Sequence, residues 1–293
     1  MTKKAPQPDL VDLHVHSSAS DGVLAPREVV RQAAEVGLRA IALTDHDTVA
    51  GLSEALAAGV EFHIEVIPGV EISAEFEGGA CHILGYLLER ADKALAEVLV
   101  SAREGRESRN AEILKLLADL NVNLTMDEVL GGDADGTITR AHFASAMIAR
   151  GYVKSFDEAF DKYLGAGKPA YVHRLRITPS EAIRAIRGAG GLASLAHPRQ
   201  LNRGAAETEE WIAKLAADGL EAVETATPDH TANYARRFSE VARRLGLLET
   251  GGTDWHGRED AAIDLGVGAG SMAVHYDLVQ KIKDRLAERR AGR

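Results

Sequence analysis

Short apolar segments that carry a histidine, an aspartate or a glutamate recur six times in this chain of 293 residues. In the first segment, residues 11–15, apolar and polar residues alternate as they do in a strand. Side chains two positions apart on a strand project to the same side, so the imidazoles of His14 and His16 can bind one metal ion. One such pair is a weak signal, but six segments restricted to these polar residue types are difficult to explain without metal ions.

The candidate metal ligands come from all six segments and from Asp21, which follows the first segment closely. They are His14, His16, Asp21, His46, Glu71, His82, His197, Asp254 and His256. Nine ligands exceed what one ion needs, and the Glu71 carboxylate could bridge two cations that would otherwise repel each other. Imidazole and carboxylate without thiolate suit manganese, iron, zinc or magnesium, and the ligand count predicts two or three such ions.

Helical segments alternate with the short apolar segments over much of the chain. Helical spacing is found in residues 27–36, 178–188, 207–217 and 231–245. This alternation predicts an α/β protein with a mainly parallel sheet or barrel, in which the strand ends collect catalytic groups at one face.

Strand signals vanish between Lys93 and about Lys168. Helices are expected there at residues 102–120, 125–130, 140–150 and 155–164. We therefore expect a barrel domain of residues 1–100 and 171–293, and a helical insertion, or lid, of residues 101–170. Thr139 is the expected N-cap of the third of these helices.

Charge and composition restrict the class of partner. The formal net charge of −10 argues against broad binding of nucleic acid through a basic surface, although it does not exclude a phosphorylated substrate. The single cysteine, Cys81, excludes an internal disulfide framework. Neither a signal sequence nor a long apolar run is evident, so we expect a cytoplasmic protein that binds no membrane and no DNA and has no obligate protein partner.

The metal-ligand segments resemble, in order, the signatures of the polymerase and histidinol phosphatase (PHP) superfamily of metal-dependent phosphoesterases. These are His14-Val15-His16 with Asp21, Thr44-Asp45-His46-Asp47, Glu71-Ile72-Ser73, His82, Ala196-His197-Pro198 and Thr253-Asp254-Trp255-His256. Residues 17–22, 45–51, 82–86 and 163–171 resemble the bacterial branch of nucleoside 3',5'-bisphosphate phosphatases and 5'-3' exoribonucleases. Asp21 stands where some relatives carry a histidine, which should favour a harder ion such as manganese.

The resemblance implies a distorted seven-stranded (β/α) barrel, similar to a TIM barrel, and three metal positions. It assigns His14, His16, Glu71 and Asp254 to one ion, Glu71, His82 and His197 to a second, and Asp21, His46 and His256 to a third. A metal-bridging hydroxide is then expected to attack phosphorus, with Glu71, Asp254 and His197 as the catalytic residues. Asp45 and Asp47, on either side of His46, are expected to orient it.

The substrate class is also implied by the resemblance: a nucleoside 3',5'-bisphosphate that loses its 3'-phosphate, with short 5'-phosphorylated RNA as a further substrate. Helix N-termini and arginine side chains bind phosphate groups favourably. Further cationic or aromatic side chains at the rim of the pocket are expected to contact the substrate. The expected substrate-binding residues are Arg140, His142, Lys168, Tyr171 and Arg199.

Several alternatives remain open. Histidinol phosphate or another small phosphomonoester could be the substrate, and some PHP domains are non-catalytic structural modules. For four single residues we expect no role in catalysis or binding. Trp255 is expected in the core, Glu75 in solvent, and His173 and His230 in structural roles.

Overall fold

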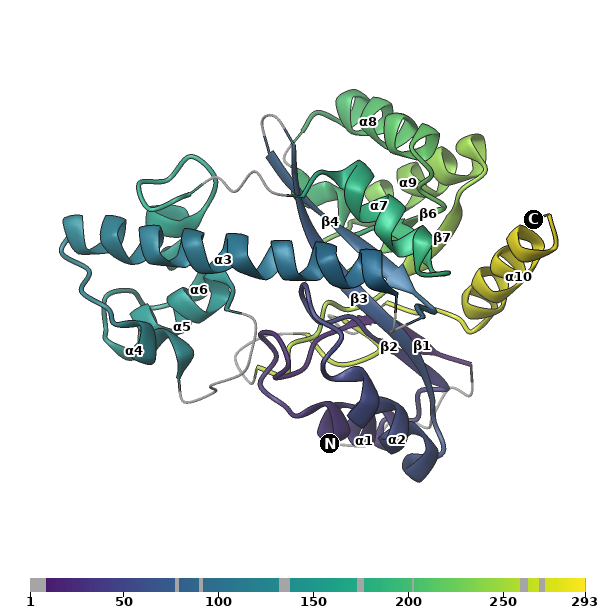
Figure 1. The fold of residues 1–293 in the computed structure, drawn as a ribbon, viewed down its shortest axis with the longest axis horizontal. Coiled ribbons are helices and arrows are strands. Elements are labelled where there is room, and N and C mark those ends of the chain that lie inside the picture. Colours follow the sequence, from purple (N-terminus) through teal and green to yellow (C-terminus); the bar gives the residue numbers. More distant parts are fainter. Residues whose placement is uncertain are drawn as a thin grey trace.

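The computed structural model describes residues 9–76, 79–89, 92–131, 138–172, 177–201, 203–258, 263–268 and 272–292. Its centre is one sheet of seven strands in sequential order (Figure 1). The strands are β1 (Val11–Val15), β2 (Ala40–Leu43), β3 (Glu65–Phe76), β4 (Gly79–Tyr86), β5 (Leu192–Leu195), β6 (Ala222–Ala226) and β7 (Leu248–Gly251). Val15 also pairs with Trp255, just beyond β7, so the sheet nearly closes into a barrel. The predicted distorted seven-stranded barrel is confirmed.

The direction of β4 is the main distortion of this barrel. β4 runs antiparallel to both β3 and β5, whereas the other neighbouring strands pair in parallel. His82 lies within the first half of β4, where it pairs with Ser73. Because β4 is reversed, this half of the strand lies at the same edge of the sheet as the later residues of β3.

Helices surround the sheet, and the predicted ones are present. The four predicted segments correspond to α1 (Pro26–Glu35), α7 (Pro179–Gly188), α8 (Ala205–Ala217) and α9 (Ala232–Leu245), and the structure adds α2 (Leu52–Phe62) and α10 (Asp277–Ala291). In α9, for example, Phe238, Val241 and Ala242 have the three- and four-residue spacing of one helical face, and all three are buried. Thr231 begins this helix by accepting a hydrogen bond from the amide of Tyr234.

A second group of helices extends away from the barrel, to the left in Figure 1. It consists of most of α3 (Lys93–Asp119), α4 (Met126–Leu130), α5 (Arg140–Ala149), α6 (Phe156–Ala159) and a π-helical turn (Phe160–Leu164). These elements enclose a separate apolar cluster that includes Ile113, Phe143 and Met147.

Helix α3 connects the two parts of the molecule. It begins at Lys93, earlier than predicted, because Asp92 caps it through the amide of Leu95. Its first turns contribute Leu95 and Leu99 to the core of the barrel, whereas Ile113 belongs to the apolar cluster of the outer helices. The predicted boundary between residues 100 and 101 thus falls inside one continuous helix, and the division into barrel and insertion remains a proposal.

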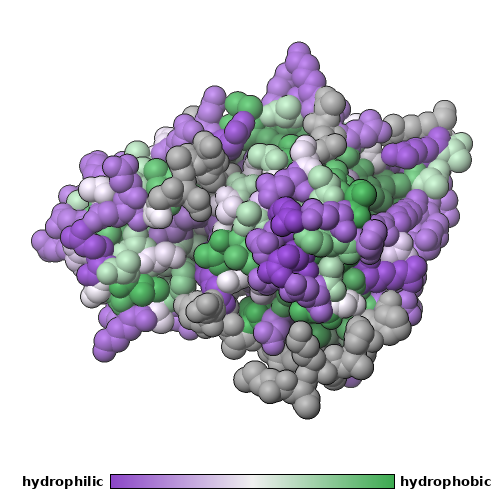
Figure 2. Space-filling view, turned by 90° about the horizontal axis from the view of Figure 1, so that it is seen from below, coloured by the Kyte–Doolittle hydropathy of each residue, from purple (hydrophilic) through white to green (hydrophobic). Residues whose placement is uncertain are grey.

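The surface in Figure 2 shows several separate hydrophobic patches among hydrophilic residues, as is usual for a surface in contact with water. Among the described residues, no helix combines the length and the apolar character needed to cross a membrane.

Candidate metal centre and adjoining cavity

The carboxylate of Glu71, on β3, lies at the centre of the candidate site. Five imidazoles approach its two oxygens. His14 Nε2, His16 Nε2 and His46 Nδ1 lie 3.2, 3.2 and 3.1 Å from Oε2, and His82 Nδ1 and His197 Nε2 lie 2.8 and 3.1 Å from Oε1. These residues come from β1 and the position just after it, from β4, and from the loops that follow β2 and β5, so the nearly closed sheet brings remote segments together.

Eight of the nine predicted ligands fall into three overlapping groups, two of which include this carboxylate. Within each group, one ligand atom per residue lies within 4.8 Å of the others. The groups are His14, His16, Glu71 and Asp254; His46, Glu71 and His82; and His16, Asp21, His46 and His256. His197 adjoins the second group, with its Nε2 3.2 Å from His82 Nδ1. The ion that each residue would bind remains a prediction.

The chemistry of this cluster fits divalent cations. His14 Nε2, both ring nitrogens of His16, His46 Nδ1 and Glu71 Oε2 are buried and have no hydrogen-bond partner among the described residues. Buried polar atoms are rarely left without a partner, and lone pairs that converge on one point are satisfied by a cation. The backbones of His197 and Asp254 also have positive φ angles, 24° and 54°, which non-glycine residues adopt mainly where the surroundings enforce it.

Electrostatics couple the carboxylates to the imidazoles. Burial alone would raise the pKa of the Glu71 carboxyl, but His46, His82 and His14 hold it well below its usual range. Burial likewise disfavours the charged form of His16, yet Asp254 and Glu71 raise the pKa of this imidazole to about 10. For His46 burial prevails and lowers the pKa to about 3. At neutral pH a proton on His16 would therefore compete with a cation for this imidazole.

Two carboxylates that the sequence had not indicated support the ligands. Glu224, on β6, contacts His14 Nδ1 at 3.1 Å through Oε1 and accepts a hydrogen bond of 2.7 Å from the amide of His197 through Oε2. Asp12 accepts hydrogen bonds from Thr253 and from the amide of Gly266, which fixes the loop before Asp254.

Asp45 and Asp47 hold loops in place, whereas the expectation was that they orient His46. Asp45 accepts hydrogen bonds from the amide and hydroxyl of Ser17 and from the hydroxyl of Ser20, which orders the turn that leads to Asp21. Asp47 accepts hydrogen bonds from the amide of Ser73 and from Arg106 Nε, at 2.7 and 2.6 Å.

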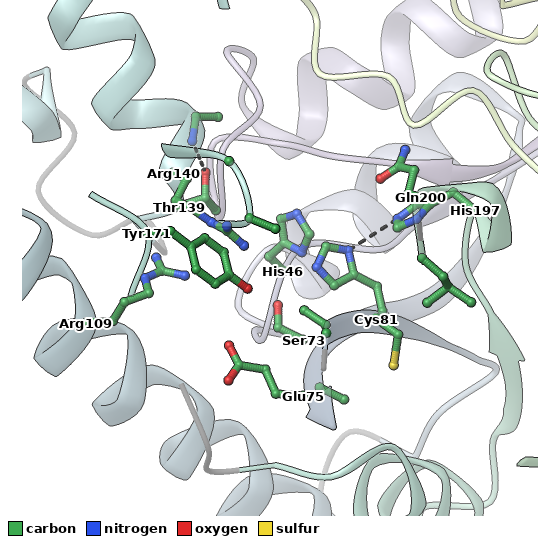
Figure 3. Close-up of a pocket in the computed structure, with 18 of the residues that line it drawn as sticks. His46, Ser73, Glu75, Cys81, Arg109, Thr139, Arg140, Tyr171, His197 and Gln200 are labelled. Carbon is green, nitrogen blue, oxygen red and sulfur yellow. Dashed lines mark hydrogen bonds between the residues drawn. The ribbon is translucent and has the colours of Figure 1, made fainter. Parts of the chain in front are cut away.

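A cavity of about 570 Å³ opens beside the metal cluster. Asp21, His46, His82 and His197 are among the residues that line it, and Figure 3 shows His46 and His197 in this cavity. Four arginines, Arg106, Arg109, Arg140 and Arg203, also line it, together with the aromatic rings of Phe160 and Tyr171. Cationic and aromatic groups therefore share one cavity with four of the predicted metal ligands.

The predicted substrate-binding residues divide into two sets. Arg140 and Tyr171 line the cavity, and the Arg140 guanidinium lies 4.9 Å from the centre of the Tyr171 ring. His142, Lys168 and Arg199 are not among the described residues that line it. His142 Nδ1 accepts a hydrogen bond from the amide of Thr139, the confirmed N-cap of α5.

Arg199 lies in a 3₁₀ turn (Pro198–Leu201), where its guanidinium donates a 2.6 Å hydrogen bond to the carbonyl of Asp229. Its contact with substrate remains a prediction. Arg106 and Arg109 were missed, although their three-residue spacing on a predicted helix was a readable signal of one basic face.

The remaining single-residue expectations have mixed outcomes. Trp255 is buried in a core cluster, as expected. Glu75 lines the cavity, whereas the expectation was a solvent-facing side chain. The ring of His230 is buried against Phe238, and its Nδ1 contacts the carbonyl of Thr225. His173 lies outside the described residues.

Comparison with known proteins agrees with this geometry. Residues 12–168 match the PHP domain. A 5'-3' exoribonuclease of Haemophilus influenzae is 38% identical over 260 residues, which cover 87% of this chain and 91% of that protein. A 3',5'-nucleoside bisphosphate phosphatase of Chromobacterium violaceum is 36% identical over 257 residues, covering 87% and 90%. A crystal structure from Bifidobacterium adolescentis, assigned as a metal-dependent phosphoesterase, superposes with a TM-score of 0.83 at 30% identity and covers 96% of this chain and 97% of that one.

Proposed function

The chain belongs to the PHP domain family, and from this premise we infer that it is a metal-dependent hydrolase of phosphate esters. We propose that it removes the 3'-phosphate of nucleoside 3',5'-bisphosphates. One observation carries this proposal: a cluster suited to divalent cations shares a cavity with four arginines. Cations on one side can hold the phosphate that is cleaved, and guanidinium groups on the other can hold a phosphate that is not.

The nine clustered residues would hold three metal ions, with manganese as the preferred metal. The group that contains Asp21 offers three imidazoles and one carboxylate. It contains no thiolate, the type of ligand that would favour zinc. Divalent cations supply an activated water nucleophile and neutralise charge on the phosphoryl oxygens. Around them, the chain contributes Glu71 as the common carboxylate and the buried imidazoles as its partners.

The cavity has the size and the lining that a nucleotide requires. Its volume of about 570 Å³ falls in the range of small-molecule sites, roughly 300–1,000 Å³. Phe160 and Tyr171 can pack against a nucleoside, and Arg140, next to Tyr171, can bind the 5'-phosphate by charge-assisted hydrogen bonds. Binding of the uncleaved phosphate would fix the direction in which the substrate enters.

Short 5'-phosphorylated RNA is a second candidate substrate. The relative from Haemophilus influenzae is a 5'-3' exoribonuclease and aligns over 87% of the chain, which favours this activity. The same arginines could bind the 5'-phosphate of RNA, with the first internucleotide linkage at the metals in place of the 3'-phosphate.

Chromatographic analysis of the products from a substrate panel tests the proposal, with inorganic phosphate expected from the phosphomonoesters and a 5'-mononucleotide from RNA. The panel contains adenosine 3',5'-bisphosphate, 3'-AMP, a 5'-phosphorylated ribotrinucleotide and histidinol phosphate, each assayed with manganese and with chelator. We expect the highest kcat/KM for the bisphosphate and loss of activity with chelator. A preference for histidinol phosphate, or for 3'-AMP over the bisphosphate, would contradict the proposed substrate class.

A further inference from the structure

Glu224 is a buried carboxylate that contacts two of the proposed metal ligands without belonging to any of the three groups. It lies on β6, and its side chain is fully shielded from solvent. Oε1 lies 3.1 Å from His14 Nδ1, and Oε2 lies 2.7 Å from the backbone nitrogen of His197. Each oxygen of this carboxylate therefore serves a different ligand.

The contact with His14 determines which ring nitrogen can bind a metal ion. An ionised carboxylate only accepts hydrogen bonds, so this contact favours the tautomer of His14 in which Nδ1 carries the proton. The lone pair of His14 is then on Nε2, which faces Glu71 and Asp254 at 3.2 and 3.4 Å. Outer carboxylates of this kind fix the orientation and tautomer of a ligating histidine.

The contact with His197 supports a backbone that is otherwise unfavourable. His197 has a φ of 24°, a value that non-glycine residues rarely adopt. The hydrogen bond from its amide to Glu224 holds that conformation, and the ring is thereby aimed so that Nε2 lies 3.1 Å from Glu71. One carboxylate thus orients a ligand on β1 and a ligand after β5 at the same time.

We propose that Glu224 is a positioning residue that holds His14 and His197 ready to bind metal. This inference rests on the metal dependence proposed above and concerns the affinity for metal, not the identity of the substrate. An amide of the same shape could not replace the carboxylate. The side chain introduced by Glu224→Gln would present one oxygen and one NH₂ group. If the NH₂ group faces the amide of His197, two hydrogen-bond donors are in contact. If it faces His14 Nδ1 instead, it favours the tautomer of His14 with the proton on Nε2, the nitrogen that should bind metal.

The test is Glu224→Gln in the full-length protein, stripped of metal and titrated with Mn²⁺ by calorimetry. We expect at least one site to bind about 10- to 100-fold more weakly than in the wild type, the range typical for loss of such an outer partner. Excess Mn²⁺ should restore occupancy. The matched control is Glu249→Gln, on the neighbouring strand β7. This change removes a carboxylate that accepts hydrogen bonds from the hydroxyls of Thr225 and Ser239, and it should leave the affinity for Mn²⁺ unchanged.

A second variant keeps the test informative if Glu224→Gln does not fold. Glu224→Asp keeps the charge but withdraws the carboxylate from both donors, so it should also weaken Mn²⁺ binding. If either variant folds, as judged by circular dichroism, and binds Mn²⁺ as tightly as the wild type, the positioning role is overturned. Because no substrate is present, this result is independent of the proposed function: a wild type that binds Mn²⁺ but releases no phosphate would contradict only the latter.

Discussion

The hydroxyl of Thr139 donates a 2.9 Å hydrogen bond to Asp21 Oδ2, across 118 positions of the sequence. Thr139 is the N-cap of α5, in the group of helices outside the barrel, and Asp21 belongs to one of the three metal-ligand groups. The same oxygen of Thr139 also accepts the amide of Ala141, so one side chain both begins a helix and contacts the metal centre. The position of α5 and the geometry of Asp21 are therefore linked.

Thr139→Val should weaken metal binding as well as stability. Valine has the shape of threonine but lacks the hydroxyl, so α5 loses its cap, at a cost of about 1 kcal/mol, and Asp21 loses a partner. We expect about tenfold weaker Mn²⁺ binding at one site, as for other outer partners of metal ligands. Thr178→Val removes an equivalent cap from α7 and is the control. Equal Mn²⁺ affinities in the two variants would show that the contact with Asp21 does not matter for metal.

Glu71→Gln should be the most damaging change at the centre. Two of the three groups include Glu71, and five imidazoles face its carboxylate. We expect the folded variant to lose at least two ions and kcat/KM to fall more than about 100-fold, beyond the usual effect of an outer partner. Asp254→Asn, in one group only, should lose one ion. Elemental analysis of both proteins checks this order, and a Glu71→Gln protein that retains all its metal would disprove the bridging role.

Metal affinity should rise with pH between about 6 and 9. Asp254 and Glu71 raise the pKa of His16 to about 10, so a proton must leave before a cation can bind at neutral pH. Affinity should increase up to tenfold per pH unit for each proton displaced. Calorimetry in buffers of different ionisation enthalpy counts these protons. His46 contributes none, because burial lowers its pKa to about 3.

The metal-free protein should show the opposite trend in stability. The pKa of His16 is raised from 6.5 to about 10, so its contribution to folding is complete below pH 6.5 and is lost as pH rises towards 10. Thermal unfolding in chelator should therefore occur at lower temperature at pH 9 than at pH 6.5, with a smaller difference in the presence of Mn²⁺. A melting temperature of the metal-free protein that rises over this interval would contradict the assignment.

The strand-borne ligands were predictable because strand alternation fixes the direction of each side chain. The two-residue period of a strand was sufficient to predict that His14 and His16 project to the same side. The apolar segments around Glu71 and His82 indicated strands. The direction of β4 was not predictable, since a short apolar segment is the same for parallel and antiparallel pairing. Glu224 was missed because its segment carries no histidine, and its role depends on contacts with β1 and with the loop after β5.

The cavity side of the site depended on tertiary packing and was predicted less well. The sequence indicated a helix that contains Arg106 and Arg109, but which face of α3 meets the barrel depends on both ends of that helix being packed into different cores. Arg199 is two residues from His197, yet the 3₁₀ turn directs its guanidinium to the carbonyl of Asp229. Closeness in sequence to His197 therefore did not decide which side chains line the cavity: Gln200 does, whereas Arg199 is not among the described residues that do.

Arg140→Gln should impair the bisphosphate selectively. Arg140 lines the cavity that also includes four of the proposed metal ligands, and we propose that it binds the phosphate that is not cleaved. Loss of a hydrogen bond to a charged group costs about 1.5–3 kcal/mol, which corresponds to a roughly 10- to 100-fold lower kcat/KM for adenosine 3',5'-bisphosphate. For 3'-AMP, which lacks the second phosphate, the same change should matter little. Arg199→Gln is the control, because Arg199 is bonded to Asp229 and does not line the cavity. Equal losses on both substrates in Arg140→Gln would mean that this arginine serves the reacting phosphate or the fold, whereas a selective loss in Arg199→Gln would place the second phosphate on the other side of His197.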